Sequence, residues 1–408
     1  MDILAATQAL LRKNRRRVET HQFTVPSHDV YPFQWQWDSA FHAIMLSHFD
    51  LSSAKAELLA AVSHPLPSGL LPHMIYWNHD DTPPPNWGRE LRGAEIDRAW
   101  QAQHSSSITQ PPVLAQAALR VYQRAKEIDH DWLRALYNPL LRHFEYLAQE
   151  RTFNGDSLLY IINPDESGED NSPRFDEALG LPPQHTEDDN LNARLKLMQH
   201  NADCNFAAKA CMSQHFGVAD VSFNILYAED LLALAIIARE LGEVESASAL
   251  KARGHRVKQD IVAGLKAGDW FLSYDHIRKT HINVLTWNVF MPLYGGLLSE
   301  TEARRLVDEY LFNSRYFWTE YGMVTTALTE PAFDPTDGFW RGPIWFAPHW
   351  FIYQGLVKYG FLDEAIIIRE KTERLLIESG FCEHFNPLSG QGLGAKDFTW
   401  GGLFIDMD

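Results

Sequence analysis

Apolar residues recur at helical spacing along most of the chain. Within residues 223–241, one face of a helix would carry Phe223, Leu226, Leu231, Leu234, Ile237 and Leu241. This spacing predicts an amphipathic helix, and Gly242 directly after it is typical of a helix C-terminus. The same pattern predicts helices near residues 3–17, 52–63, 112–127, 131–150, 246–266, 300–312, 344–359 and 362–379, and about a dozen helices once weaker candidates are included.

Strand patterns are short and scattered, as in SLLYII (157–162) and WFLSYD (270–275). Because strands and helices do not alternate, a doubly wound sheet is disfavoured. No linker divides the chain, and paired helices are joined by long loops rich in Pro, Gly, Trp and Asp, at 65–110, 163–190, 315–345 and 381–401. The pattern predicts one all-α domain over residues 1–408, a closed toroid of helix pairs with loop insertions near 65–110 and 163–220.

The charge balance limits the partners. The chain of 408 residues has 36 Lys and Arg against 53 Asp and Glu, a formal net charge of −17. Binding to nucleic acid or an anionic membrane needs a basic face, so neither partner is expected. The basic cluster from Lys13 to Arg17 falls in the first predicted helix, and we interpret it as a solvated helix face. Assembly into a homo-oligomer is left open.

Three cysteines, Cys204, Cys211 and Cys382, are too few for a disulfide framework and fit a reducing compartment. The N-terminal residues lack the features of a signal peptide, and no apolar run approaches the roughly 20 residues of a membrane span. We therefore expect a soluble, cytoplasmic protein. Cys204, Cys211 and His215 fall on one helix-like stretch, but their spacing is no standard zinc pattern, so we expect thiols and no metal site.

Neither a phosphate-binding loop nor a nucleophilic serine motif is found in the sequence. GQGLGAK (390–396) resembles a phosphate-binding loop, but Asp397 follows Lys396 where such a loop needs Ser or Thr. No GxSxG sequence marks a nucleophilic serine. No cofactor is expected.

Carboxylates are the remaining candidates for chemistry. The stretch NPDESGEDNSP (163–173) contains Asp165, Glu166, Glu169 and Asp170, and Glu383 lies in a second loop rich in turn formers. A like-charged neighbour or a dry pocket raises the pKa of an acid, so Asp170 and Glu383 suit an acid–base pair. Ordinary loop carboxylates fit the same pattern. The 13 tryptophans likewise fit either a core or the walls of a sugar cleft, because flat rings match the C–H face of a pyranose.

Four motifs occur together and in order: FQWQWDSAF (33–41), ESGEDNSPRFD (166–176), FWRGPIW (339–345) and FCEHFNPLSGQGLGAKDFTW (381–400). This set resembles glycoside hydrolase family 63, especially the compact bacterial and plant enzymes that hydrolyse mannosylglycerate and glucosylglycerate. The resemblance spans roughly residues 20–400 and is weakest at 177–220. It implies an (α/α)6 barrel and inverting hydrolysis of an α-glycosidic bond, with Asp170 as general acid and Glu383 as general base.

The resemblance also implies a set of sugar contacts. Asp38 and Gln110 would hydrogen-bond sugar hydroxyls, and Gly168 would bring its backbone close to the sugar. Aromatic walls and supporting groups would come from Tyr31, Trp35, Trp340, Arg341, Trp345 and Trp400.

Two positions depart from the family pattern. Asp165 stands where the subgroup usually has Trp, which removes a stacking wall and adds a charge beside the reactive sugar. Phe339 stands where the family has Tyr, which removes a hydroxyl. Glycerate needs a cation for its carboxylate, and Arg194 or Lys196 could supply it.

The expected function is hydrolysis of a small α-glucoside or α-mannoside, with a small carbohydrate as the substrate and a homo-oligomer possible. Glucosylglycerate and mannosylglycerate are candidate substrates, and trehalose, kojibiose or nigerose are the alternatives. Two other classes stay open. A sugar isomerase or epimerase would use cleft histidines such as His73 or His384, and a carbohydrate-binding protein would need no catalytic acid.

Overall fold

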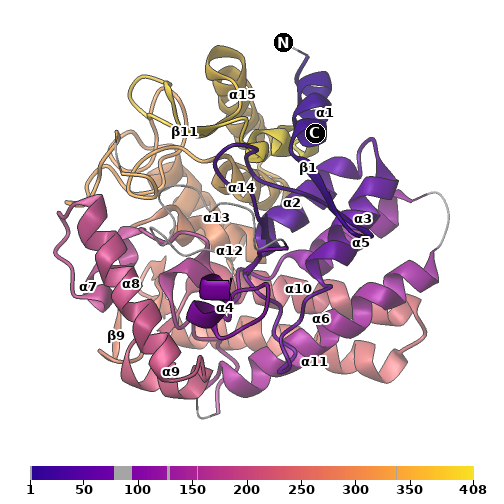
Figure 1. Ribbon diagram of the computed structural model, residues 1–408. Coiled ribbons are helices and arrows are strands. Elements are labelled where there is room, and N and C mark those ends of the chain that lie inside the picture. The colour runs from indigo at the N-terminus through magenta and orange to yellow at the C-terminus, as the bar shows by residue number, and fades with distance from the viewer. Residues whose placement is uncertain (1, 78–93, 126–128, 154, 337) are drawn as a thin grey trace.

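The computed structural model describes all residues except 1, 78–93, 126–128, 154 and 337 (Figure 1). The middle of the predicted insertion 65–110 and the end of the predicted helix 112–127 lie outside the described residues. The α-helices are α1 (Ile3–Lys13), α2 (Gln36–Leu46), α3 (Leu51–Ala61), α4 (Ala94–Trp100), α5 (Leu114–Arg124), α6 (His130–Glu150), α7 (Asp176–Leu179), α8 (Glu187–Asp203), α9 (Ala208–Gln214), α10 (Val221–Glu240), α11 (Val244–Gly264), α12 (Met291–Gly295), α13 (Glu300–Leu306), α14 (Phe346–Lys358) and α15 (Leu362–Ser379).

Shorter helical turns and strands complete the chain. The 3-10 helices are η1 (Pro164–Ser167), η2 (Pro173–Phe175), η3 (Trp287–Phe290) and η5 (Thr399–Asp406), and η4 (Val307–Leu311) is a π-helix. The strands are β1 (Arg15–Val18), β2 (His21–Thr24), β3 (Gln34–Trp35), β4 (Met74–Ile75), β5 (Val218–Ala219), β6 (Lys266–Ala267), β7 (Trp270–Phe271), β8 (Tyr274–Asp275), β9 (Thr280–His281), β10 (Cys382–Phe385) and β11 (Gly392–Lys396). They form small antiparallel sheets, β1–β2, β3–β4, β5–β8–β9, β6–β7 and β10–β11.

Helical contacts around the core form a closed series: α2 contacts α5, and the series continues through α10, α12, α14 and η5 back to α2. A second layer packs outside it, with α1 on η5, α3 on α2, α6 on α5, α11 on α10 and α15 on α14. The two layers follow from the sequence pattern, because α2 is buried along its whole length whereas α11 buries a single stripe. The fold is therefore mostly helical, as predicted.

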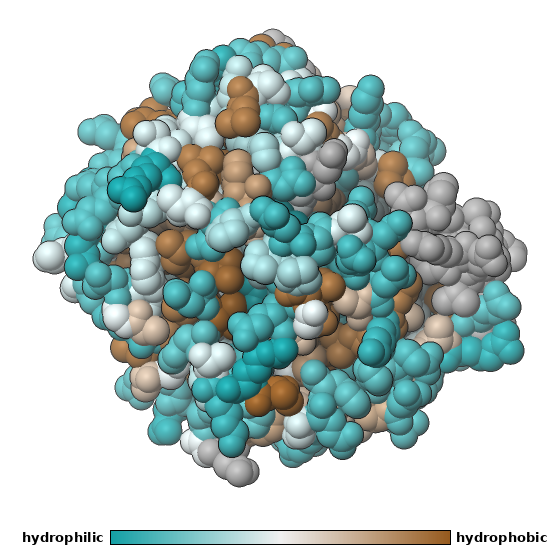
Figure 2. Space-filling model, turned by 90° about the vertical axis from the view of Figure 1, so that its left-hand side faces the viewer, coloured by the Kyte–Doolittle hydropathy of each residue, from teal (hydrophilic) through white to brown (hydrophobic). Residues whose placement is uncertain are grey.

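The helix α10 shows how the inner layer is built. Among the described residues it is the one helix long and apolar enough to cross a membrane by length and composition, and 83% of that apolar window is buried inside the protein. A helix that is apolar all round belongs in a core when its neighbours cover it. The surface drawn in Figure 2, by contrast, is mainly hydrophilic, with smaller apolar areas between the polar side chains.

Several local predictions need correction. The first helix ends at Lys13, and Arg15–Val18 form strand β1, so the basic cluster is not a solvated helix face. Lys13 instead pairs with Asp397 and Arg15 with Asp50. Residues 157–162 form no strand beyond a bridge between Ile161 and Val218. The segment 270–275 does contain strand residues, in β7 and β8.

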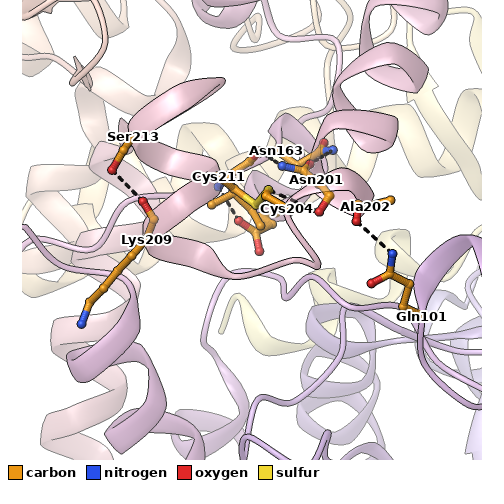
Figure 3. The surroundings of a disulfide bond; sticks show 10 residues. Gln101, Asn163, Asn201, Ala202, Cys204, Lys209, Cys211 and Ser213 are labelled. Atoms are coloured by element: carbon orange, nitrogen blue, oxygen red, sulfur yellow. Dashed lines mark hydrogen bonds between the residues drawn. A yellow bond between two sulfur atoms is a disulfide. The ribbon is translucent and has the colours of Figure 1, made fainter.

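The cysteines also depart from expectation. Cys204 and Cys211 form a disulfide (Figure 3), where thiols were expected, and Cys382 is a buried thiol. On one continuous helix, residues seven apart would lie roughly 10 Å apart along the axis, too far for a disulfide. The break between α8 and α9 brings the two Cα atoms to 6.0 Å.

The disulfide lies close to the loop that carries the predicted acid. Just before it, Asn201 donates to the carbonyl of Ile162 (3.3 Å), and Asn163 donates to the Asn201 side chain (3.3 Å) (Figure 3). The end of α8 is thereby tied to the start of the 163–173 loop. The position of α8 therefore affects the candidate active site.

Candidate active site

One cavity, of about 160 Å³, collects nearly all of the predicted site residues. Its lining is Pro26, Tyr31, Trp35, Trp37, Asp38, His73, Gln110, Asp165, Gly168, Asp170, Arg194, Phe339, Trp340, Trp345, Glu383, Phe398 and Trp400. These side chains come from segments spread over the whole sequence, which the closed series of helices brings together. The wall is largely aromatic, and the carboxylates face the same space.

Glu166 and Glu169 of the 163–173 loop are buried and serve as anchors of that loop. Glu166 accepts two hydrogen bonds from Arg151 (2.6 and 2.7 Å) and two more from the backbone N–H groups of Thr109 (3.1 Å) and Ile162 (2.7 Å). Its carboxylate is therefore saturated and unavailable for chemistry.

Glu169 is held in the same manner from the other side of the loop. It accepts hydrogen bonds from Arg174 (2.7 and 3.2 Å), from the Trp287 indole (2.8 Å) and from the Asn288 amide (2.8 Å). Burial of a carboxylate is tolerated when charged and polar donors surround it. Two of the four acids in the loop are thus fixed in place, and they hold the other two toward the cavity.

Gly168 stands where the loop passes closest to another chain segment. Its φ of +74° is in the left-handed region, and a Cβ atom there would overlap the indole ring of Trp37. The close approach in this structure is therefore between the loop backbone and Trp37, beneath the cavity lined by both residues.

Asp170 and Asp165 share one cation. The Nη1 atom of Arg194 lies 2.6 Å from Asp165 Oδ1 and 2.6 Å from Asp170 Oδ2. Arg194 comes from α8, where its Nε donates to Asn190 (3.0 Å). Burial raises the pKa of Asp170, the Arg194 charge opposes that rise, and the Asp165 charge adds to it.

Glu383 also lines the cavity and lies on strand β10. It accepts hydrogen bonds from the Tyr31 hydroxyl (2.6 Å) and from the N–H of Ala395 on β11 (2.8 Å). Burial raises its pKa to about 7, and the charges of Asp170 and Asp38 act in the same direction. A general base works best when its pKa lies near the working pH.

Asp38 lies in the first turn of α2, is buried and lines the cavity. The indole of Trp400 donates to it (2.7 Å), and burial raises its pKa to about 6. Gln110 accepts a hydrogen bond from the Trp37 N–H (3.2 Å), which orients its amide toward the same wall. Trp340 and Trp345 stack on each other with ring centroids 4.0 Å apart.

Arg341 is the predicted contact that does not line the cavity. Its guanidinium forms two bonds to Asp176 (2.8 and 2.9 Å) and another to the carbonyl of Pro183 (2.6 Å). This geometry fits a supporting ion pair and not a sugar contact. Lys196, one of the two candidate cations, is exposed and does not line the cavity, whereas Arg194 does.

Sequence reasoning missed three lining residues, Pro26, Trp37 and Phe398. Trp37 lies inside the motif FQWQWDSAF and Phe398 two residues before Trp400, so aromatic neighbours of the chosen residues were the available signal. Among the described residues no group of His, Cys, Asp and Glu is arranged to hold a metal ion.

Comparison with known proteins decides the family. A family model described as the mannosylglycerate hydrolase MGH1-like glycoside hydrolase domain matches residues 31–401. The chain belongs to this family. It is accordingly a glycoside hydrolase of family 63, as the motifs indicated.

Several relatives of this glycoside hydrolase are similar over nearly their whole length. Mannosylglycerate hydrolase from Thermus thermophilus is 31% identical, covering 96% of this chain and 96% of the relative. The enzyme of the same name from Rubrobacter radiotolerans is 30% identical, covering 100% and 96%. Glucosylglycerate hydrolase from Mycolicibacterium hassiacum is 26% identical, covering 91% and 90%.

The fold agrees as well. The crystal structure of a family 63 mannosylglycerate hydrolase from Thermus thermophilus, in complex with Tris and D-glycerate, superposes with a TM-score of 0.87. The two are 27% identical, and the match covers 99% of this chain and 100% of the other.

Proposed function

We propose that this glycoside hydrolase cleaves the α-glycosidic bond of a small glucoside or mannoside with inversion, using Asp170 as general acid and Glu383 as general base. The observation that carries the proposal is that two carboxylates of raised pKa face one aromatic-walled cavity. The closed series of inner helices and the outer layer support an (α/α)6 barrel as the frame.

In this mechanism Asp170 protonates the oxygen of the leaving group while Glu383 removes a proton from water that attacks the anomeric carbon from the other face. Inverting pairs stand about 6.5–9.5 Å apart, which leaves space for that water. Tyr31 and Ala395 orient the Glu383 carboxylate, and the Trp400 indole orients Asp38 for hydrogen bonds to sugar hydroxyls. Trp340 and Trp345 line the cavity and offer aromatic surface to the sugar.

The names of the relatives suggest glycosylglycerates as one substrate class, and neutral disaccharides such as trehalose, kojibiose and nigerose form the alternative. The small cavity volume favours a small glycoside over a polysaccharide. A net charge of −17 supports a protein without nucleic-acid or membrane partners. We propose the cytoplasm as the location, and in that reducing compartment Cys204 and Cys211, which form a disulfide in this structure, would be thiols.

An isomerase or epimerase is disfavoured by the histidines. Burial lowers the pKa of His73 to about 4 and that of His384 to about 3, and His384 stacks on Trp345. His384 is not among the described residues that line the cavity, and His73 is the one histidine there, so a pair of cleft histidines is not found among those residues.

Proton NMR of the first-formed sugar tests the proposal. Hydrolysis of an α-linked substrate should release the β-anomer first, and E383Q should abolish that signal. An α-anomer as first product would overturn inversion, and full activity of E383Q would overturn the role of Glu383.

A further inference from the structure

The charged cluster of Asp165, Asp170 and Arg194 lies on the acid side of the cavity. Arg194 Nη1 contacts both carboxylates at 2.6 Å, and its Nε is held by Asn190, which is buried in α8. Among the described residues that line the cavity, Arg194 is the only Lys or Arg side chain. Among these described lining residues, this one guanidinium is the cation that a negative charge on a substrate could meet.

The leaving group departs on the side of the acid, so its surroundings are set by this cluster. Before the reaction Asp170 carries a proton, and the charges of Asp165 and Arg194 then cancel. A carboxylate on the leaving group would find no uncompensated cation among the described lining residues and would lie beside the Asp165 carboxylate. Like charges at such contact are costly in a partly buried site.

The same pair also explains how a cation is tolerated beside a general acid. Arg194 alone would stabilise the ionised form of Asp170 and weaken it as a proton donor, and the Asp165 charge opposes this effect. As the proton leaves Asp170, the contact with Arg194 stabilises the carboxylate that forms. Asp165 and Arg194 are thus interdependent, and each makes the other compatible with the chemistry.

Resting on the function proposed above, we infer that Asp165 is a specificity-determining residue: paired with Arg194, it makes the leaving-group site electroneutral, so that this enzyme takes an uncharged, hydroxyl-bearing leaving group in preference to a carboxylate-bearing one. Hydroxyls suit the site, because the Asp165 carboxylate is a hydrogen-bond acceptor and the aromatic wall is uncharged.

A matched pair of substrates tests the inference: α-glycosyl glycerol and α-glycosyl glycerate, which differ in a hydroxymethyl against a carboxylate, each with glucose and mannose. Wild type should favour the glycerol compound by about tenfold or more in kcat/KM. D165N keeps the shape but leaves Arg194 uncompensated, so the preference should move toward the glycerate compound by about tenfold or more, mainly through a lower KM. In D165N/R194M this gain should vanish. D269N, which removes an exposed carboxylate paired with Arg305, should leave the preference unchanged.

Calorimetric titration with free D-glycerate separates this inference from the proposed function. D165N should bind D-glycerate about tenfold or more tightly than wild type. A wild-type preference for the glycerate compound, or D165N and wild type agreeing within about twofold in both substrate preference and D-glycerate binding, would overturn the inference. Absence of hydrolysis by wild type on these compounds and also on trehalose, kojibiose and nigerose would overturn the proposed function instead, while the binding difference would still decide the role of Asp165.

Discussion

The two proposed catalytic carboxylates have different surroundings. Glu383 is held by uncharged donors, a phenol and a backbone N–H, on a β-hairpin. Asp170 contacts a guanidinium that a second carboxylate neutralises, and that guanidinium comes from α8. Both carboxylates lie in motifs that resemble the family, but the acid side also carries Asp165, which departs from the family pattern. We expect the surroundings of Glu383 to determine which sugar is accepted and the surroundings of Asp170 to determine which leaving group is accepted.

A substrate whose leaving group needs no proton should separate the two sides by the largest factor. D170N should lose about 10²–10⁴ in kcat on an O-glycoside, because proton donation is removed. On the matching α-glycosyl fluoride, whose fluoride departs without protonation, D170N should stay within about tenfold of wild type. E383Q should lose activity on both, since water still needs a base. Equal losses of D170N on the two substrates would contradict the assignment of Asp170 as acid.

Stability should separate a buried anchoring acid from an exposed acid on the surface. E166Q breaks the buried contact with Arg151 and should lower the free energy of unfolding by about 3–5 kcal/mol. E370Q, an exposed position on α15, should change it by less than about 0.5 kcal/mol. Urea denaturation followed by circular dichroism measures both. A loss below about 1 kcal/mol in E166Q would mean that the loop is held mainly by its backbone.

The smallest expected effect is a shift of the pH profile at the base. Glu383 must be ionised to act, so kcat/KM should fall as pH decreases through about 7. The Tyr31 hydroxyl donates to the ionised carboxylate and lowers its pKa. Y31F should therefore move this limb of the profile to higher pH. An unmoved limb would show that the limb does not report the ionisation of Glu383.

Two helices and the disulfide show which features of the fold can be predicted from the sequence alone. The helix expected at 223–241 is α10, Val221–Glu240, because its apolar spacing is regular and its ends carry clear signals. The helix α2 escaped prediction because all of its residues are buried, so no polar face contrasts with an apolar one. The disulfide escaped because it depends on the break between α8 and α9, which the helical pattern across 204–215 concealed.

The residues of the active site were likewise predicted from the sequence only in part. The motifs pointed to the residues of the cavity, with Arg341 as the exception, whose partner Asp176 lies 165 positions away in sequence. The pairing of Arg194 with Asp165 and Asp170 could be raised only as a possibility for glycerate, since nothing in the sequence placed α8 beside the loop.

By itself the sequence determined that the chain is helical, that its motifs are those of a family of glycoside hydrolases, and that a loop with four acids matters. Only the tertiary structure decided what each acid does. Glu166 and Glu169 are buried against Arg151 and Arg174 as anchors, while Asp165 and Asp170 face the cavity and share Arg194. The physical reason is that the role of a carboxylate is set by its burial and by the charge of its neighbours, and those neighbours come from distant parts of the chain.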